Sequence, residues 1–338
     1  MIDVLVAGGG PAGLATAIGA ARAGLEVVVV EPREGSVDKA CGEGLMPGAV
    51  RALRELAGPV HGMAFHGIRY LDGSSSAEAA FRHGHGLGVR RTVLSSTLRG
   101  AAEAAGVGFA TGRVTDVRQD DGFVTAAGRR ARWLVGADGL HSSVRAAIGA
   151  ARADSRAYRF GQRRHFAVAP WSDLVEVHWA ARAEAYVTPV ATDLVGVAVL
   201  TSERGGFEQH LRAFPALLER LPPQAVSRTR GAGPLRQQVS TRRVGRVLLV
   251  GDAAGYVDAL TGEGLAVSFA TAQALVDCLL RDRPQDYESR WRQLSRRYRL
   301  LTAGLLAARR VPGVGRAIVP ASARLPRAFA AVVDQLAR

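Results

Sequence analysis

A glycine-rich turn and a later acid have the residue types and spacing of a dinucleotide-binding site. The turn comprises Gly8, Gly9, Gly10, Pro11, Ala12 and Gly13. Its first glycine permits a tight bend, its second lets a diphosphate approach the backbone, and its third allows a helix to pack closely on a strand. Glu31 follows Gly13 by eighteen residues and can accept hydrogen bonds from both ribose hydroxyls. Because a 2′-phosphate would meet like charge there, the pattern favours FAD or NAD over NADP.

Two strands and a helix must hold these groups in place. Residues 2–7 and 25–31 read as buried strands, and residues 14–24 between them read as an alanine-rich helix that ends at a glycine. This order places the turn at a helix N-terminus, where free N–H groups attract phosphate. No second strand–GxGxxG–helix order occurs, since "GAGPLR" from residue 231 follows no strand. A separate, stable domain for a nicotinamide dinucleotide is therefore not predicted.

Two further segments each end a buried strand with an acid beside glycine. They are VGADGLHSSVR at residues 135–145 and RVLLVGDAAGYVDALTGEGL at residues 246–265. With the first turn they make three motifs in order. Over residues 1–290 the chain resembles the flavoprotein monooxygenases of the para-hydroxybenzoate hydroxylase type and the related geranylgeranyl reductases. The resemblance implies a tightly but non-covalently bound FAD, and NAD(P)H that docks transiently and leaves after hydride transfer.

The resemblance also implies which residues contact FAD. Arg91 matches an arginine that reaches the phosphates, Val114 a backbone contact to adenine, and Asp252 the residue that holds the ribityl chain. Asp138 matches an aspartate linked to both FAD and NAD(P)H binding. The residues that match the diphosphate site are Gly8, Gly10, Ala12 and Gly13. Glu31 matches the contact to the adenosine ribose, and Arg33 matches its surroundings. The residues that match the pyrimidine edge of the flavin are Gly262, Gly264 and Leu265. Backbone amides of the last group would stabilise negative charge on the reduced ring.

The stretch VDKACGEGLMP at residues 37–47 holds the only lysine in a chain with forty-three arginines, beside one of two cysteines. It follows the second strand, where the geranylgeranyl reductases carry a cysteine–glycine loop beside the flavin ring. The match is partial, because Glu43 stands where that family usually has glycine. Cys41 is expected to line the site, either as scaffold or with a thiol that gates the flavin or donates a proton. Lys39 either holds a phosphate or a nicotinamide, or pairs with Asp38.

Several side chains in the predicted substrate domain are candidates for substrate contact. His178 and Tyr186 fall in runs that alternate as an antiparallel sheet does, and either is a candidate to orient a phenol. His83 and His85 either flank a substrate or lie exposed on a sheet edge. The predicted catalytic set is thus Cys41, His178 and Tyr186, and no metal site is assigned.

The order of elements predicts an α/β fold with a discontinuous domain. The expected architecture is a Rossmann-like FAD-binding domain with an inserted antiparallel β-sheet substrate domain and a helical C-terminal tail. The FAD-binding domain is predicted at residues 1–60, 86–154 and 235–290, the substrate domain at 61–85 and 155–234, and the basic helical segment at 291–338. Apolar residues make up 48% of the chain, which suffices for a core of this size.

The net charge of +14 is unevenly distributed. Residues 290–338 hold eleven arginines against one acid, Asp334, in a stretch rich in Leu, Ala and Val that Pro312, Pro320 and Pro326 interrupt. This composition is typical of short amphipathic helices on an anionic lipid surface, and also of a solvated helical cap with codon-biased arginines. A nucleic-acid-binding protein is not favoured, because no aromatic–basic platform or reading helix is evident.

The ends and the cysteines of the chain bear on its location. The N-terminus enters a strand without a charged leader, and no apolar run approaches the roughly 20 residues that a membrane span needs. Cys41 and Cys278 are distant in sequence and form no CxxC pair, so no disulfide framework is expected. These features predict a cytoplasmic protein, with a peripheral membrane contact if the tail binds lipid.

Two flavoenzyme functions fit the motifs. The first is an NAD(P)H-consuming monooxygenase that uses O2 to hydroxylate a hydrophobic, phenolic small molecule, and it is favoured because hydroxylation is the commoner chemistry on this fold. The second is a reductase of the geranylgeranyl reductase type that saturates isoprenoid C=C bonds, and the cysteine–glycine loop favours it. A flavin-dependent halogenase is not expected, since its WxWxIP signature is absent.

Overall fold

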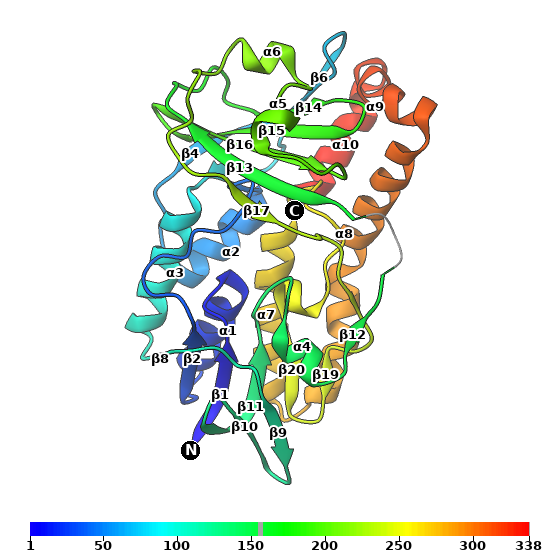
Figure 1. Cartoon of the computed structure of the whole chain (residues 1–338). Coiled ribbons are helices and arrows are strands. Elements are labelled where there is room, and N and C mark those ends of the chain that lie inside the picture. The colour runs from blue at the N-terminus through cyan, green and yellow to red at the C-terminus, as the bar shows by residue number, and fades with distance from the viewer. Residues whose placement is uncertain (155–157, 338) are drawn as a thin grey trace.

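The computed structural model describes residues 1–154 and 158–337. It contains two large sheets, one above the other, with the N-terminal elements in the lower half (Figure 1). The orange and red helices near the C-terminus run along one side of both halves. The predicted domain boundary at residue 155 and the last residue, 338, lie outside the described residues.

The lower sheet has eight strands, and its central neighbours β8–β2–β1–β11–β20 are all parallel. Its strands are β1 (Ile2–Ala7), β2 (Val27–Glu31), β8 (Gly108–Thr111), β9 (Val117–Asp120), β10 (Phe123–Ala126), β11 (Arg129–Gly136), β19 (Arg243–Val244) and β20 (Val247–Leu249). Apolar runs form the central strands because other elements cover both of their faces. Since parallel strands share one carboxyl edge, the segments that follow β1, β2, β11 and β20 meet at that edge.

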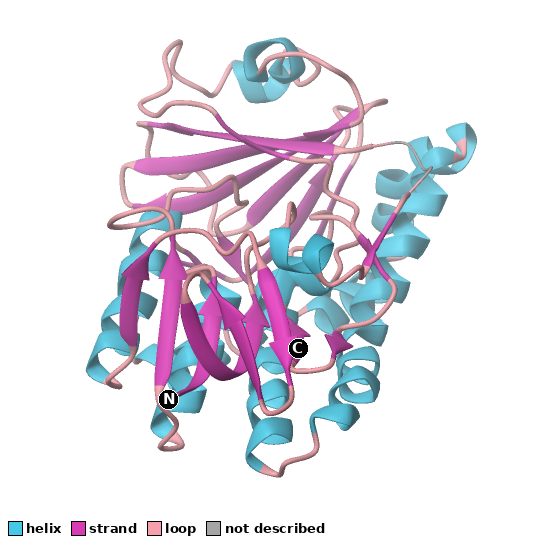
Figure 2. Ribbon diagram, turned by 60° about the horizontal axis from the view of Figure 1, so that its bottom comes forward, coloured by secondary structure: helices cyan, strands magenta, loops and turns pink. Residues whose placement is uncertain are grey.

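Helices flank the lower sheet (Figure 2), and α1 packs against both α3 and α7. The helices are α1 (Pro11–Arg22), α2 (Pro47–Ala57), α3 (Arg91–Ala104), α4 (Ser143–Ala147), α5 (Phe207–Leu211), α6 (Pro215–Leu218), α7 (Gly264–Leu280), α8 (Tyr287–Arg310), α9 (Pro312–Arg324) and α10 (Pro326–Leu336), with 3-10 turns η1 (Gly251–Ala254) and η2 (Pro284–Asp286). Proline begins α1 without loss, because the first N–H of a helix has no partner within it. The helix therefore starts three residues earlier than the sequence pattern predicts.

The upper sheet has seven strands in the order β17–β13–β16–β15–β14–β5–β6. Its strands are β5 (Gly67–Leu71), β6 (Ser76–Ala80), β13 (Phe160–Phe166), β14 (Val175–Trp179), β15 (Ala183–Ala191), β16 (Leu194–Thr201) and β17 (Arg230–Ala232). All neighbouring pairs are antiparallel except β14 and β5, which run parallel. The predicted antiparallel sheet is present, and the parallel pair joins the early hairpin β5–β6 to it.

Two small sheets complete the strand pairing. One contains β3 (Gly44–Leu45), β7 (Gly86–Gly88) and β4 (Met63–Phe65), and the other pairs β12 (Ala151–Arg152) with β18 (Gln238–Val239). The pairing of β3 with β7 fixes the end of the cysteine-containing loop, because β3 begins three residues after Cys41.

The basic C-terminal segment forms most of α8 and two further helices. Pro312 and Pro326 begin α9 and α10, whereas Pro320 lies inside α9. The expectation that Pro320 interrupts the tail is therefore wrong. Both α9 and α10 pack against β6, where Phe329 and Val333 join an apolar cluster. None of the described helices combines the length and apolar character that crossing a bilayer requires.

A buried group of charges fastens α8 to the upper sheet. Glu184 of β15 is fully buried and forms ion pairs with Arg309 of α8 and, at 2.7 Å, with Arg159. Nε of the same Arg159 guanidinium lies 3.0 Å from Oδ2 of Asp258. Burial lowers the pKa of Arg309 to about 10, and the neighbouring Arg159 lowers it too. The carboxylate of Glu184 therefore compensates two buried arginines at once.

Replacing Glu184 with Gln is expected to lower the free energy of unfolding of the FAD-loaded protein by about 3 kcal/mol, because removing one partner leaves buried charge uncompensated. Denaturant titration would measure the change. In the matched variant Glu103→Gln, an exposed pair with Arg99 is lost, and the expected change is within about 0.5 kcal/mol. Equal effects of the two substitutions would contradict a structural role for the buried group.

Candidate active site

A cavity of about 1120 Å³ lies at the carboxyl edge of the lower sheet and extends to the upper sheet. It brings together predicted site residues that are far apart in the sequence. Those that line it are Gly8, Gly10, Ala12, Glu31, Arg33, Lys39, Cys41, Arg91, Val114, Asp138, Tyr186, Asp252, Gly262, Gly264 and Leu265. Gly13 and His178 do not line it.

The glycines of the first turn have different physical roles. Gly8 has a φ of +108°, and a Cβ there would lie 2.6 Å from the carbonyl oxygen of Ala137. A Cβ at Gly13 would collide with the carbonyl of Gly8, so Gly13 allows α1 to pack on the turn rather than facing the cavity. Gly10 is open, with no heavy atom within 4 Å of a Cβ position. The space at the N-terminus of α1 fits a diphosphate.

Glu31 ends β2 as a buried carboxylate held by three hydrogen bonds. Its Oε2 accepts the N–H of Gly9 at 2.7 Å, and its Oε1 accepts the backbone N–H of Arg33 at 3.2 Å and Nε of Arg33 at 2.7 Å. Burial favours the neutral acid, but the bonds from Arg33 and Gly9 outweigh it and lower the pKa of Glu31. A charged acceptor is therefore available on the cavity wall beside the turn.

Arg91 opens α3 with its side chain buried at the cavity wall. Its Nε makes no hydrogen bond among the described residues. Because buried donors are normally satisfied, this N–H fits an anion such as a phosphate. Val114 also lines the cavity, and its carbonyl accepts a hydrogen bond from Ser143 Oγ at 2.6 Å.

Asp138 follows β11 and uses its carboxylate largely within the protein. Its oxygens accept Ser142 Oγ at 2.5 Å, Ser143 Oγ at 3.0 Å and the N–H of Val144 at 3.1 Å. These contacts fix the start of α4. The resemblance implies that Asp138 takes part in binding FAD and NAD(P)H. Because its carboxylate is already hydrogen-bonded within the protein, it would do so mainly by fixing the shape of this loop.

Arg145 was missed by the sequence reasoning, and it joins the two acidic loops. Its guanidinium is buried and donates to the carbonyls of Leu140 at 2.6 Å and Ala253 at 3.2 Å, and to Gln237 Oε1 at 2.8 Å. Burial lowers its pKa, and Asp138 and Asp252 act in the opposite direction. The available signal was its position in VGADGLHSSVR, seven residues after the acid.

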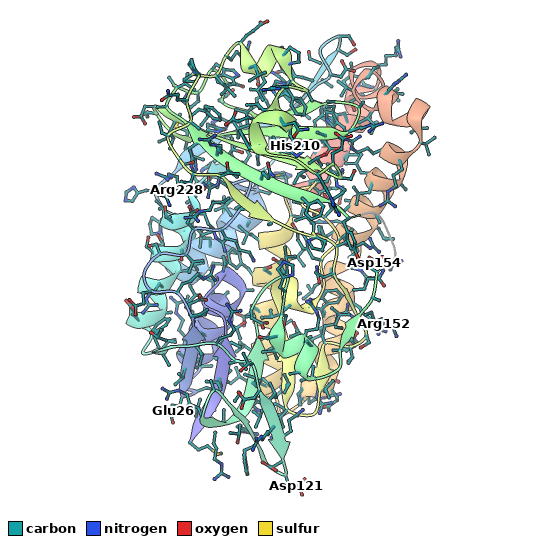
Figure 3. All side chains as sticks on the ribbon, viewed as in Figure 1. Glu26, Asp121, Arg152, Asp154, His210 and Arg228 are labelled. Carbon is teal, nitrogen blue, oxygen red and sulfur yellow. The ribbon has the colours of Figure 1, made fainter. Side chains whose placement is uncertain are left out.

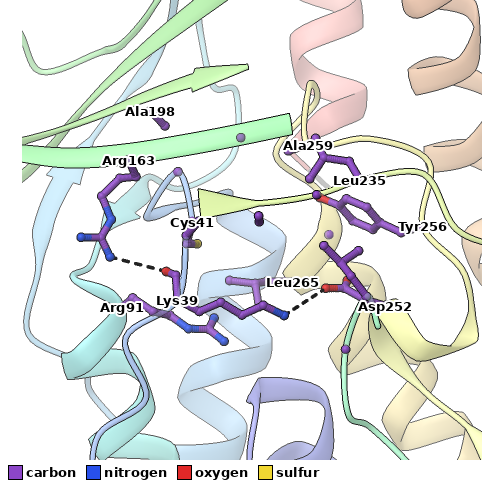
Figure 4. Close-up of a pocket in the computed structure, with 18 of the residues that line it drawn as sticks. Lys39, Cys41, Arg91, Arg163, Ala198, Leu235, Asp252, Tyr256, Ala259 and Leu265 are labelled. Carbon is purple, nitrogen blue, oxygen red and sulfur yellow. Dashed lines mark hydrogen bonds and ion pairs between the residues drawn. The ribbon is translucent and has the colours of Figure 1, made fainter. Parts of the chain in front are cut away.

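Lys39 and Asp252 face each other across the cavity (Figure 4). Lys39 Nζ lies 4.0 Å from Asp252 Oδ2, and both side chains are about one third exposed. The same ammonium lies 2.9 Å from a Cβ position at Gly139. Of the two alternatives for Lys39, pairing with Asp38 is not what the structure contains, because Asp38 bonds Arg163 at 2.5 Å and Arg230 at 2.8 Å instead.

Cys41 lines the cavity as predicted, and Glu43 anchors its loop. The Glu43 backbone has a φ of +59° and its N–H donates to Cys41 Sγ at 3.4 Å. The Glu43 carboxylate is buried, accepts the backbone N–H of Arg91 at 2.8 Å, and lies 2.7 Å from Nε2 of His165. The departure from the family glycine thus supplies a buried anchor.

Two residues of β13 complete this anchor, and neither belongs to a motif that is recognisable in the sequence. Arg163 is buried and lies 3.5 Å from Glu43 Oε1, while its Nη2 also contacts the carbonyl of Lys39 at 3.4 Å. Its Nη1 lies 3.1 Å from Nδ1 of His165. A strand of the upper sheet therefore holds the cysteine-containing loop of the lower half in place.

The N-terminus of α7 borders the opposite wall. Gly262, Gly264 and Leu265 line the cavity there, and the amides that the resemblance places at the flavin edge therefore border the same space as the first turn. Between them, Glu263 is buried and pairs with Arg297 at 3.2 Å. Burial raises the pKa of Glu263 to about 7, despite the opposing effect of Arg297. Its Oε2 has no hydrogen-bond partner among the described residues, so this oxygen is suited to carry a proton.

The two substrate-sheet candidates differ in position. Tyr186 lines the cavity, but its hydroxyl donates to the Leu260 carbonyl at 2.8 Å, and burial raises its pKa well above the usual value. His178 points away from the cavity, because neighbouring Val175 and Val177 occupy the inward face of β14. It contacts Glu176 at 3.2 Å and the Phe214 ring. Strand alternation places His178 on the other face of the sheet from Val177.

The cavity fits FAD on independent features of its wall. The open position at Gly10, the unpartnered Nε of Arg91 and the carboxylates of Glu31 and Asp252 are donors, acceptors and space of the kinds that a diphosphate, a ribose and a ribityl chain require. The N-terminus of α7 supplies amides at the far end.

Comparison with known proteins agrees with this geometry. Residues 1–281 match the family model described as FAD binding domain. A menaquinone reductase from Mycolicibacterium smegmatis is 29% identical over 335 residues, covering 86% of this chain and 79% of the relative. A chloroplastic geranylgeranyl diphosphate reductase from Oryza sativa is 31% identical over 308 residues, covering 78% and 63%.

The fold is similar to that of solved flavoenzymes. A p-nitrophenol 4-monooxygenase from Pseudomonas putida superimposes with a TM-score of 0.81 at 20% identity, covering 100% of this chain and 98% of that protein. The α/β fold predicted from the sequence is thus confirmed, with its FAD-binding half, its additional sheet and its helical C-terminal region. The chain belongs to the FAD-binding domain family and is a FAD-dependent oxidoreductase.

Proposed function

We propose that the protein is a FAD-dependent reductase that saturates a C=C bond in an isoprenoid-type lipid, with NAD(P)H as a transient hydride donor. The observation that carries the proposal is an apolar end of the cavity, formed where it meets one hydrophobic cluster. Its wall is built from Phe65, Ile68, Val175, Val177, Leu260 and Leu336. Such a wall suits a hydrocarbon chain, which gains free energy by leaving water and needs no polar partner.

Helix α10 closes this apolar end. Leu336 of α10 lines the cavity, and the next carbonyl, that of Ala337, accepts the N–H of Gly48 at 2.9 Å. This bond fastens α10 to the start of α2. We infer that a hydrocarbon chain bound against this apolar wall would displace water, which favours hydride delivery to an unpolarised double bond.

When bound, FAD supplies a hydride from its reduced ring. The residues of this chain would hold and surround that ring. Asp252 would bind the ribityl hydroxyls, and amides around Gly264 would face the pyrimidine edge. Cys41 would line the reacting face and donate the proton that completes saturation, since it lines the cavity while the nearby Glu43 carboxylate is already held by Arg91 and His165.

Hydroxylation of a hydrophobic phenol is the second candidate, and the whole-length likeness to p-nitrophenol 4-monooxygenase favours it. That reaction would need O2 and a group that activates the phenol. Two residues are candidates from the sequence to orient the phenol. His178 lies on the face of β14 that points away from the cavity, and the Tyr186 hydroxyl already donates a hydrogen bond to the Leu260 carbonyl. Reduction does not need such a base. Two of the relatives above are also reductases by name.

We infer further that the substrate is taken from an anionic lipid surface. Helices α9 and α10 expose Val314 and Val332, and Leu325 is exposed between the two helices. The arginines at 316, 324 and 327 are exposed on the same two helices, and Asp334, the acid of this stretch, is buried. Exposed apolar and basic groups on helices that close an apolar cavity favour contact with anionic lipid.

Product analysis would test the reaction. Incubation of the FAD-loaded enzyme with NADPH and a polyprenyl quinone or geranylgeranyl diphosphate is expected to yield a product that has gained two hydrogen atoms, detected by mass spectrometry. The same gain is expected without air, because C=C reduction consumes no O2. Formation of a product with one added oxygen, seen with p-nitrophenol or the lipids and only in air, would contradict the reductase and support the second candidate.

Asp252→Ala is expected to weaken FAD binding by at least about tenfold, since the hydrogen bonds of a charged acceptor would be lost. The ratio of flavin absorbance to protein after gel filtration would report occupancy. Asp121→Ala, in an exposed turn at the far end of the lower sheet, is the matched control and should retain wild-type occupancy. Full flavin retention in Asp252→Ala would reject the ribityl role.

Replacing Arg316, Arg324 and Arg327 together with Gln is expected to weaken binding to phosphatidylglycerol vesicles on the order of 100-fold, at about 1 kcal/mol for each arginine. Vesicle sedimentation would measure it. A matched triple variant at the exposed Arg51, Arg118 and Arg129 should sediment as the wild type does. Equal sedimentation of both triple variants, or none by the wild type, would reject the lipid contact.

A further inference from the structure

A second pocket of about 420 Å³ lies behind the Asp252 loop, between η1, α7 and α8. Its wall contains five arginines, at 152, 236, 242, 292 and 299, and one acid, Asp252. Figure 3 places Arg152 on the flank of the molecule beside α8. No step of the proposed reaction uses the arginines of this pocket.

The positive charge of the pocket is only partly neutralised. Arg236 pairs with Asp154 at 2.5 Å, while Arg242 and Arg292 share Glu288 at 3.1 Å and 2.9 Å. Within the described part of the chain, Arg152 and Arg299 form no ion pair. Burial lowers the pKa of Arg242, and the nearby Arg299 and Arg292 lower it further, although Glu288 opposes them. These guanidinium groups repel one another and favour an anion between them.

An independent feature points into the same pocket. Ser295 of α8 is 1% exposed, and its Oγ has no hydrogen-bond partner among the described residues. Buried hydroxyl groups normally form hydrogen bonds, so this one is available to donate a hydrogen bond to a ligand. Beside it, the buried Trp291 ring lies under the guanidinium of Arg242 at 3.9 Å and near that of Arg299 at 5.6 Å. The ring therefore holds these two guanidinium groups at the pocket.

We propose that this pocket binds a phosphate or diphosphate group, held by Arg152, Arg242 and Arg299 and by the hydroxyl of Ser295. Guanidinium groups recognise phosphate through paired, charge-assisted N–H bonds, which a small halide cannot use as fully. The volume exceeds what one phosphate fills, so part of the attached molecule enters with it. The pocket is distinct from the diphosphate position at Gly10, which belongs to the other cavity.

The pocket adjoins the flavin site, so a ligand bound in it can affect that site. Gly251, Asp252, Tyr256, Gly264 and Ser268 line both the pocket and the large cavity. A ligand in the pocket contacts the back of the segments whose front faces the cofactor. Two molecules of the proposed reaction carry suitable groups, a phosphorylated nicotinamide dinucleotide and a prenyl diphosphate. The phosphate chemistry is the same for both, and the phosphate site itself does not depend on which reaction the enzyme performs.

Calorimetric titration of the FAD-loaded protein would test the site, because bound FAD occupies the other diphosphate position. The probes are 2′-AMP, inorganic diphosphate and geranyl diphosphate. Saturable binding of at least one, weakening as salt is raised, is expected. Preference for 2′-AMP identifies a nicotinamide dinucleotide as the source, preference for geranyl diphosphate identifies a prenyl substrate, and equal binding with inorganic diphosphate identifies a free phosphate site.

Two substitutions locate the binding. Arg299→Gln and Ser295→Ala should each weaken binding about tenfold while leaving FAD occupancy unchanged. Arg129→Gln, an exposed arginine of the distant β11, is the matched control and should bind as the wild type does. No saturable binding of any probe, or wild-type affinity in both pocket variants, would overturn the proposal. Failure of the reductase assay would leave these binding results unaffected, so the two proposals fail separately.

Discussion

The active site depends on one constraint, that loops from distant parts of the chain must meet at the carboxyl edge of a parallel sheet. Parallel pairing brings the ends of β1, β2, β11 and β20 to that edge, but it does not fix the loops that follow. Arg145 provides that connection, since its buried guanidinium bonds carbonyls on both acidic loops. Without a buried donor of this reach, Asp138 and Asp252 would belong to loops free to move independently.

Local signals predicted the lower half of the molecule well. The glycine turn, Glu31 and the acid–glycine motifs are short patterns whose meaning depends on adjacent residues, and all of them reach the cavity. Gly13 does not line the cavity, yet it packs α1 on the turn, which is the role that the third glycine of the pattern predicts. Such features are visible in sequence because backbone conformation is encoded over a few residues.

Features that depend on which strands pair were not visible. His178 was a reasonable site candidate by type, but the register of β14 places it on the outer face. Glu43, Arg163 and His165 were not recognised as a group, since 120 residues separate Glu43 from Arg163 in a chain whose sheet order is not deducible from composition. The alternative that Lys39 pairs with Asp38 was wrong for the same reason, because Arg163 of β13 and Arg230 of β17 form the ion pairs with Asp38.

The anchor around Glu43 has a consequence for how related sequences are expected to differ. A glycine at this position would remove the carboxylate that faces Arg163 and His165, leaving a buried arginine beside Asp38 alone. We therefore expect single exchanges at any of these positions to be costly and joint exchange to be tolerated. Inheritance should thus couple positions 43, 163 and 165, so that relatives with glycine in the loop carry small or uncharged residues on the facing strand.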